Sequence, residues 1–173
     1  MAQQVDRMND LVVHQLGRAG ASGVARFAAP LALQPIVQRI CDTLVKVHAD
    51  KSLRWTLDLD PTLRWRIDEG DAFEMLGNLM DNAAKWAKPQ VAVTLWLENQ
   101  ALHLRIADDG PGFAEHPESL QRRQRLDEQV PGHGIGLAVV KDLVASHQGQ
   151  LNVSRSGLGG AQVDVLLPAQ ARV

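Results

Sequence analysis

The sequence predicts an α+β fold: a two-layer α/β sandwich in which helices cover one face of a mixed, largely antiparallel sheet. Segments that alternate apolar and polar residues, as strands do, are interspersed with segments whose apolar residues recur every three or four positions, as in helices. These segments do not follow the strict strand–helix–strand repetition of a parallel sheet. The length, 173 residues, suits one packed domain with a short appendage and is too small for two ordinary domains.

The composition is that of a soluble globular protein. Hydrophobic residues make up 45%, charged residues 22%, and the formal net charge is −2, so no basic excess exists to bind nucleic acid. The single cysteine, Cys41, lies in an apolar stretch and is expected to be a buried thiol, which fits a reducing compartment. No run of about 18 apolar residues is present, so we expect no membrane span.

The first segment, residues 1–17, has the apolar rhythm of an amphipathic helix. The stripe consists of Val5, Met8, Leu11, Val12 and Leu16. Residues 18–26 are small and glycine-rich and predict a linker. The globular pattern occupies residues 27–173.

In the first half of this domain a short extended piece precedes a helix over residues 33–51, with Pro35 in its first turn. Two runs then alternate apolar and polar residues, 53–60 and 63–68, and we expect these strands to pair with each other. A second helix is predicted over about 70–87.

In the second half, strands at 91–99 and 101–109 predict a hairpin around Asn99 and Gln100. A polar loop follows, up to about residue 133. A helix over 134–147 ends near Gly149, and a final pair of strands at 150–157 and 161–168 turns at residues 158–160.

The helix segment EMLGNLMDNAAKW, residues 74–86, carries an unusual polar face. At about 100° per residue its polar side chains share one arc, opposite an apolar arc that faces the core. These polar residues are Glu74, Asn78, Asp81, Asn82 and Lys85. One interpretation is a solvated face with an Asp81–Lys85 ion pair, which contributes about 0.3 to 0.5 kcal/mol. The alternative is a ligand site, because asparagine is a poor helix former and amide and carboxylate oxygens suit magnesium.

Two glycine motifs would complete such a site with phosphate-binding groups. ADDGPGF, residues 107–113, ends a strand in a turn, and PGHGIGLAVV, residues 131–140, opens into a helix whose free N–H groups favour phosphate. A plain turn and a plain helix cap remain the structural alternatives. The spacing of the glycines excludes a Walker A loop and a Rossmann turn.

In this order the three segments resemble the N, G1 and G2 boxes of the GHKL ATPases, and among these the catalytic and ATP-binding domain of sensor histidine kinases. The resemblance extends over about residues 27–168. The stretch RRQRLDEQVPGHGIGL is most similar to the PhoQ-type kinases, and RMNDLVVHQLGRA resembles the end of a second dimerisation helix. The resemblance implies the Bergerat fold, a domain at 27–173, and ATP and Mg²⁺ as cofactors.

The resemblance also implies roles for the N-box residues. Asn78 would bind the magnesium that bridges the nucleotide phosphates, and Asn82 would lie beside it. Glu74 would polarise the attacking group and Lys85 would contact phosphate. Trp86 would either pack near adenine or belong to the core.

For the glycine boxes the resemblance implies that Asp108 accepts a hydrogen bond from the adenine amino group, while Gly110 and Gly112 let the backbone pass close to the base. Residues 114–133 would form the ATP lid, with Arg125 reaching the phosphates as a catalytic residue beside Glu74, Asn78 and Lys85. The remaining nucleotide-binding residues implied by these boxes are Phe113, Gly132, His133, Gly134, Ile135, Gly136 and Leu137.

Some positions depart from the family pattern. His133 stands where the PhoQ type has glutamine near the metal, so its part in magnesium binding is open, and Val130 replaces a lid arginine. No histidine has the neighbours of a phosphoacceptor, and His14 lies on the wrong helix.

The resemblance therefore implies the catalytic part of a sensor kinase without its own phosphoacceptor. Its expected partners are the phosphoacceptor dimerisation domain of the same kinase and a response regulator. The parent would be a homodimer in the bacterial inner membrane, with this portion in the cytoplasm. The alternatives are a GHKL ATPase and a nucleotide-sensing module without kinase activity.

Overall fold

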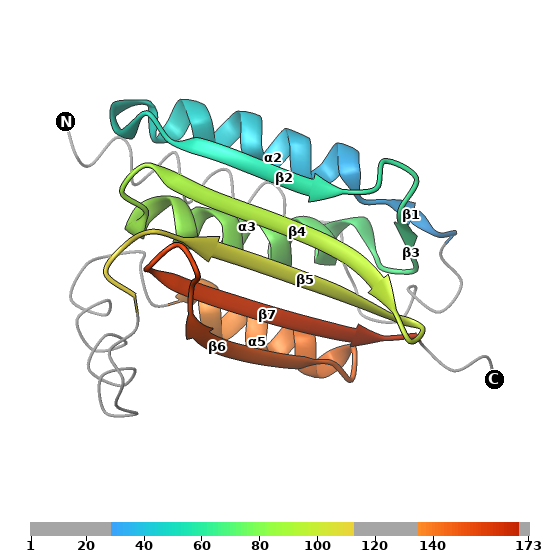
Figure 1. Cartoon of the computed structure of the whole chain (residues 1–173). Coiled ribbons are helices and arrows are strands. Elements are labelled where there is room, and N and C mark those ends of the chain that lie inside the picture. Colours follow the sequence, from blue (N-terminus) through green and yellow to red (C-terminus); the bar gives the residue numbers. More distant parts are fainter. Residues whose placement is uncertain (1–28, 113–134, 170–173) are drawn as a thin grey trace.

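The computed structural model describes residues 29–112 and 135–169, with the side chain of Ile135 excepted. The predicted helix at 1–17 and linker at 18–26 lie outside these residues. The described elements, shown in Figure 1, are β1 (Leu31–Ala32), α2 (Gln34–Val47), the 3₁₀ turn η1 (Ala49–Lys51), β2 (Arg54–Leu59), β3 (Arg64–Trp65), α3 (Glu69–Trp86), β4 (Gln90–Glu98), β5 (Ala101–Asp108), α5 (Ile135–Ser146), β6 (Gln150–Arg155) and β7 (Ala161–Pro168).

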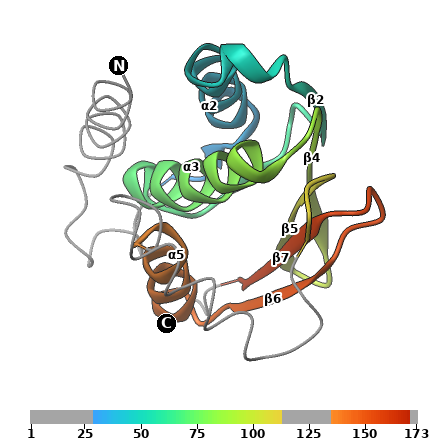
Figure 2. The same ribbon diagram turned by 90° about the vertical axis from the view of Figure 1, so that its left-hand side faces the viewer.

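The main sheet has five strands in the order β2-β4-β5-β7-β6. β2 runs parallel to β4, and every other neighbouring pair is antiparallel. Helices α2, α3 and α5 lie together on one side of this sheet (Figure 2). The predicted two-layer α+β sandwich with a mixed, largely antiparallel sheet is therefore confirmed.

Local sequence accounts for the ends of these elements. Pro35 occupies the first turn of α2, where its missing N–H costs no helical hydrogen bond. The carboxylate of Asp68 caps α3 by accepting from the N–H groups of Gly70 and Asp71, at 2.8 and 3.2 Å. Asn99 and Gln100 both have positive φ angles, of 50° and 60°, as a two-residue hairpin turn requires, and the predicted β4–β5 hairpin is confirmed.

One predicted strand pairing is wrong. β2 does not pair with the following strand but with β4, beginning at Arg54 opposite Gln90, while β3 pairs with β1. The parallel pairing brings the inward side chains of β2, such as Trp55 and Leu57, against the core. β3 has only two residues because Asp68 caps the start of α3 soon after it. It therefore has few backbone groups with which to pair with β2.

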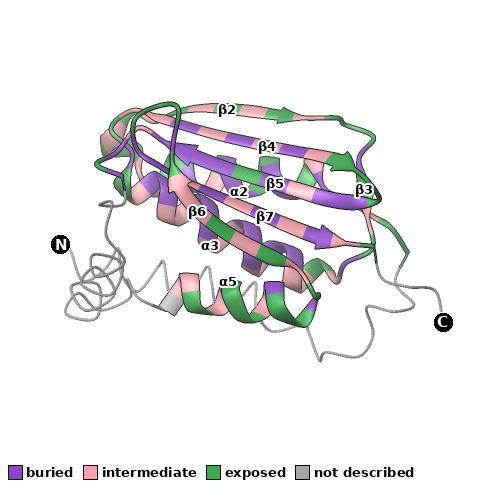
Figure 3. Ribbon diagram, turned by 60° about the horizontal axis from the view of Figure 1, so that its bottom comes forward, coloured by how far each residue is buried: buried purple, intermediate pink, exposed green. Residues whose placement is uncertain are grey.

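The core fills the space between the sheet and the helices. Buried residues alternate with partly buried ones along β4 and β7, and the inward side chains meet the apolar face of α3 (Figure 3). Cys41 of α2 belongs to this core as a free thiol that is 5% exposed, which confirms the prediction of a buried cysteine. Burial, together with the nearby Asp42, raises the pKa of its thiol to about 11.

Two histidine–aspartate pairs join α3 to its neighbouring helices. Nε2 of His48, just after α2, lies 3.0 Å from Asp81 Oδ1, and Nε2 of His147, just after α5, lies 3.0 Å from Asp71 Oδ2. α3 is therefore fixed from both sides. Within residues 29–112 and 135–169, none of the helices is long and apolar enough to cross a membrane.

Candidate nucleotide site

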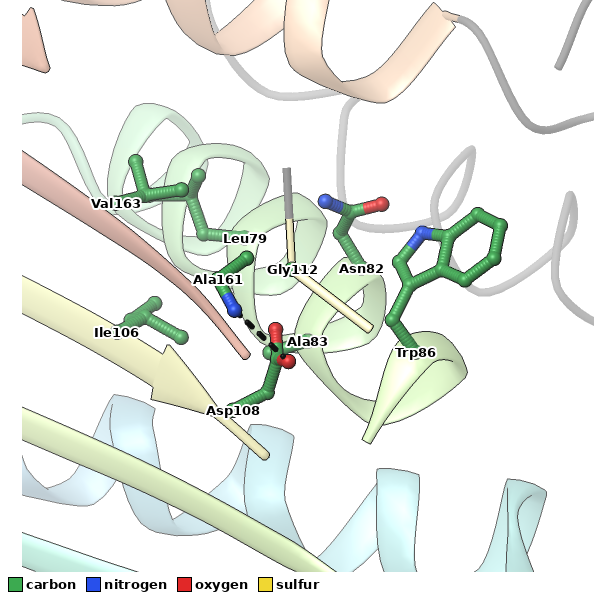
Figure 4. Close-up of a pocket in the computed structure, with 9 residues that line it drawn as sticks. All are labelled: Leu79, Asn82, Ala83, Trp86, Ile106, Asp108, Gly112, Ala161 and Val163. Carbon is green, nitrogen blue, oxygen red and sulfur yellow. Dashed lines mark hydrogen bonds between the residues drawn. The ribbon is translucent and has the colours of Figure 1, made fainter. Parts of the chain in front are cut away.

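A cleft opens where the C-terminal end of α3 lies beside the end of β5 and the start of β7. Figure 4 shows its lining: Leu79, Asn82, Ala83, Trp86, Ile106, Asp108, Gly112, Ala161 and Val163. One wall is helical and polar towards its outer end, and the other consists of strand termini. The floor between the two walls is aliphatic.

Asp108 is the charged residue of this cleft, and it is only 4% exposed. Its Oδ1 accepts hydrogen bonds from the N–H of Gly110 at 2.8 Å and from the N–H of Ala161 at 3.2 Å. Its carbonyl oxygen accepts from the N–H of Gly160 at 3.1 Å. These bonds offset part of the desolvation cost of the carboxylate and hold it in one orientation.

Two glycines allow the backbone to close around Asp108. A Cβ added at Gly160 would collide with the Asp108 carboxylate and with the backbone N of Gly110. A Cβ added at Gly110 would collide with the carbonyl group of Trp86, at the end of α3. The two walls of the cleft therefore meet in backbone contacts that no side chain could enter.

On the helical wall, the structure brings Asn82 and Trp86 into the cleft and places Asn78 one turn earlier. Trp86 is 37% exposed, so of its two predicted roles the one in core packing is wrong. Figure 4 shows its indole and the Asn82 amide side by side at the mouth of the cleft.

Asn78 links this helix to the third motif. Its Nδ2 donates to the carbonyl oxygen of Glu74 at 2.7 Å, which leaves Oδ1 to point away from its own helix. Oδ1 lies 2.8 Å from the position that a Cβ would take at Gly136, in the first turn of α5. An amide oxygen therefore faces a helix start, where free N–H groups favour anions.

Lys85 and Asp81 lie outside the cleft lining. Lys85 Nζ pairs with Asp81 Oδ2 at 2.9 Å, and the other oxygen of Asp81 faces His48. Burial works against the charged form of Asp81, but the hydrogen bond with His48 and the attraction of Lys85 together hold the pKa of its carboxyl below the ordinary value. The predicted ion pair is therefore present within α3, and the contact of Asp81 with His48 connects α3 to the end of α2.

The remaining predicted residues are distributed as follows. Glu74 is half-buried on the polar face of α3, one turn before Asn78, and Leu137 is a half-buried residue of α5 packed against the core. The lid at 114–133 lies outside the described residues. So do the site residues Phe113, Arg125, Gly132, His133 and Gly134, and the side chain of Ile135.

The contribution of β7 to the cleft is not evident from the sequence. The N–H groups of Gly160 and Ala161 bind Asp108, and Val163 lines the floor, although these residues follow Asp108 by more than fifty positions. From its sequence context, the double glycine at 159–160 predicts only a hairpin turn. Gly160 must lack a side chain because it lies against Asp108, and the two residues meet only because β5 pairs with β7.

Among the described residues, no three or more histidine, cysteine, aspartate and glutamate side chains gather in a group that could hold a metal ion. On α3, the side-chain oxygens near the cleft that could bind a metal ion belong to Asn78 and Asn82. A hard cation here would take only a small share of its ligands from this part of the chain.

Comparison with known proteins gives one family. The model of the histidine kinase-, DNA gyrase B-, and HSP90-like ATPases matches residues 67–171. The two-component sensor PhoQ of Pseudomonas aeruginosa is 38% identical over 162 residues, which cover 91% of this chain and 36% of that protein. The chain spans little more than a third of the length of the curated relatives it matches.

Two solved structures share the fold. The mycobacterial sensor histidine kinase MprB superposes with a TM-score of 0.66 at 25% identity, covering 83% of this chain and all of that chain. Full-length ShkA in complex with AMPPNP superposes with a TM-score of 0.69 at 24% identity, covering 97% of this chain and 37% of that one.

Proposed function

Because the chain belongs to the family of histidine kinase-, DNA gyrase B-, and HSP90-like ATPases, we propose that it is the ATP-binding catalytic domain of a two-component sensor histidine kinase of the PhoQ type. The observation that carries this proposal is the buried Asp108 carboxylate, fixed by two backbone N–H groups at the end of a cleft that Trp86 and Asn82 flank.

The base would occupy this cleft. Asp108 accepts hydrogen bonds and, when ionised, donates none, so it suits the exocyclic amino group of adenine and not the carbonyl oxygen of guanine. The aliphatic floor and the exposed face of Trp86 suit a flat aromatic ring. Full-length ShkA, which includes a similar fold, forms a complex with AMPPNP, and this is consistent with the assignment.

The phosphates would extend towards the start of α5. Asn78 Oδ1 faces this helix start, and an amide oxygen is an acceptable ligand for Mg²⁺. Magnesium, when bound, would neutralise phosphate charge, and Asn82 would lie beside it. His133 and Arg125 remain proposed contacts from the lid, for metal and phosphate respectively.

Phosphoryl transfer itself would depend on position and charge more than on covalent chemistry. The γ-phosphoryl group would go to a histidine on a separate dimerisation domain, with Glu74 polarising the acceptor. Lys85 would contact phosphate with the N–H groups of Nζ that its pair with Asp81, at 2.9 Å, does not use. The whole protein would be a homodimeric inner-membrane sensor that passes the phosphoryl group to a response regulator.

Titration calorimetry with ATP, with and without Mg²⁺, tests the nucleotide site. We expect Mg²⁺-dependent binding, and we expect Asn78→Ala to weaken it at least about tenfold, the cost of a lost ligand, without loss of fold. Asn152→Ala, on the exposed edge strand β6, is the matched control and should bind normally. Equal affinity of Asn78→Ala and the unmodified chain would exclude the metal assignment.

A phosphotransfer assay separates the kinase from its alternatives. With labelled ATP, the chain alone should acquire no acid-labile label, and it should label a supplied PhoQ-type phosphoacceptor domain. Steady ATP hydrolysis without transfer would indicate an ATPase. Tight ATP binding without transfer or turnover would indicate a sensing module.

A further inference from the structure

Lys51, the last residue of η1, reaches across to the far end of α3. Its Nζ donates to the carbonyl oxygen of Ala84 at 2.7 Å and to that of Lys85 at 2.6 Å. More than thirty residues separate donor and acceptors, and no motif in the sequence includes Lys51.

These bonds complete the C-terminal cap of α3. The last four carbonyls of a helix have no partner within it, and a cation suits the negative end of the helix dipole. Here the Ala83 carbonyl accepts from the N–H of Ala87 at 2.8 Å, and the next two carbonyls accept from Lys51. The carbonyl of Trp86 packs against Gly110.

The capped turn is also one wall of the cleft. It carries Asn82, Ala83 and Trp86, while Asp108 and Gly112 belong to the opposite wall. Burial lowers the pKa of the Lys51 ammonium, and attraction to the carboxylates of Asp50, Asp108 and Asp109 opposes this effect. The ammonium therefore lies within electrostatic range of the carboxylate that would read the base.

We propose that Lys51 is a positioning residue for base selection: by capping α3 it sets the separation between Trp86 and Asp108, and so the fit of the adenine ring between them. This inference rests on the proposed nucleotide site. Without Lys51 the last turn of α3 would lose two hydrogen bonds, and the contact of the Trp86 carbonyl with Gly110 would depend on the bonds that Lys88 and Gln90 donate to Asp109 Oδ1. Lys51 would touch neither the nucleotide nor the metal.

The test compares Lys51→Met, which keeps the chain length and removes the donors, with Lys51→Arg, which restores donors and charge. Titration calorimetry measures ATP and GTP affinities for each with Mg²⁺. We expect Lys51→Met to lower ATP affinity about tenfold, the equivalent of one lost charged hydrogen bond, with GTP almost unaffected. Lys51→Arg should recover most of the preference for ATP.

Two controls separate positioning from general loss of stability. Lys46→Met removes an exposed lysine of α2 and should behave like the unmodified chain, and Ile40→Val weakens the core of α2 away from the cleft. Ile40→Val should keep the ratio of ATP to GTP affinity. Amide hydrogen exchange should also accelerate in Lys51→Met at residues 85–90 and 108–112, and not in Ile40→Val.

Each outcome decides one question. If Lys51→Met retains the full ATP-to-GTP ratio, or loses it only as much as Ile40→Val does, Lys51 has no part in selection and the inference fails. Failure of the unmodified chain to bind ATP would instead overturn the proposed function. Exchange unchanged at residues 85–90 and 108–112 in Lys51→Met would remove the structural basis of the inference even if affinity fell.

Discussion

Asp108 shows how a single residue can depend on contacts far from it in the sequence. A buried carboxylate is costly unless hydrogen bonds offset the loss of water. Asp108 obtains such bonds from Gly110, two residues on, and from Ala161, in another strand. The same bonds give its carboxylate a fixed direction, which a group that distinguishes adenine from guanine needs.

We predict that Asp108→Asn weakens ATP binding about tenfold and changes GTP binding little, because one buried acceptor is replaced by a group that also carries N–H donors. Calorimetric titration with both nucleotides measures the effect. Asp164→Asn, on the outer face of β7 where Asp164 pairs with Arg105, is the matched control. Equal losses for ATP and GTP in Asp108→Asn would argue against base recognition by this carboxylate.

At the scale of elements, the two faces of α3 have different roles. Its apolar face packs on the sheet, and its polar face divides between the cleft and the neighbouring helices. Asn78, Asn82 and Trp86 lie towards the cleft and α5, whereas Asp81 pairs with Lys85 on its own helix and contacts His48 after α2. The contact of Asp81 with His48 therefore holds the helix that carries the site.

The Asp81 contact predicts a specific pH dependence of stability. Because its pKa in the folded state lies below the ordinary 3.8, ionised Asp81 stabilises the fold above that pH, and this contribution is lost as the pH falls below it. Asp81→Asn should lower the free energy of unfolding by about 1 to 3 kcal/mol at pH 7. The difference from the unmodified chain should shrink towards zero as the pH falls below about 3.8.

Urea unfolding between pH 2.5 and 7 measures the free energy of unfolding of Asp81→Asn and of the unmodified chain. Asp142→Asn, on the exposed surface of α5, serves as the control and should show no such pH-dependent difference. If the free energies of unfolding of Asp81→Asn and the unmodified chain differ by the same amount at every pH, ionised Asp81 is not the source of the stabilisation.

At the scale of the whole molecule, the cleft joins segments that enter it separately. α3 and β5 are adjacent in the core, but β7 reaches the cleft only because it pairs with β5 across the sheet. A nucleotide in the cleft would touch all three elements at once. Binding should therefore stabilise the domain as a unit and not one loop of it.

The size of this stabilisation follows from the binding of the nucleotide to the folded state alone. At a free Mg²⁺-ATP concentration of 100 times its Kd, the free energy of unfolding should rise by about 2.7 kcal/mol. Urea unfolding with and without the nucleotide measures the shift, with Asp108→Asn at the same ATP concentration as the control. No change in the unfolding midpoint under saturating ATP would show that the folded state does not bind it preferentially.

The sequence by itself determined most of the secondary structure and the order of its motifs. Period and capping signals identified α2, α3 and the two antiparallel hairpins, because these depend on residues close along the chain. The helical wheel placed Glu74, Asn78 and Asn82 on one polar face for the same reason. The role of Asp108 came from the resemblance of its motif, ADDGPGF, to the G1 box of the GHKL ATPases, since the motif alone also fits a plain turn.

Only the tertiary structure decided which segments meet. The local sequence pattern could not show that β2 pairs with β4 in place of β3. The backbone of a strand can form hydrogen bonds with any neighbouring strand, and the pairing that occurs depends on which apolar side chains it buries. The same holds for Gly160 and Ala161 at Asp108, for the contact of His48 with Asp81, and for Lys51 at the end of α3. Each contact joins residues that the fold, and not the spacing along the chain, brings within hydrogen-bond distance.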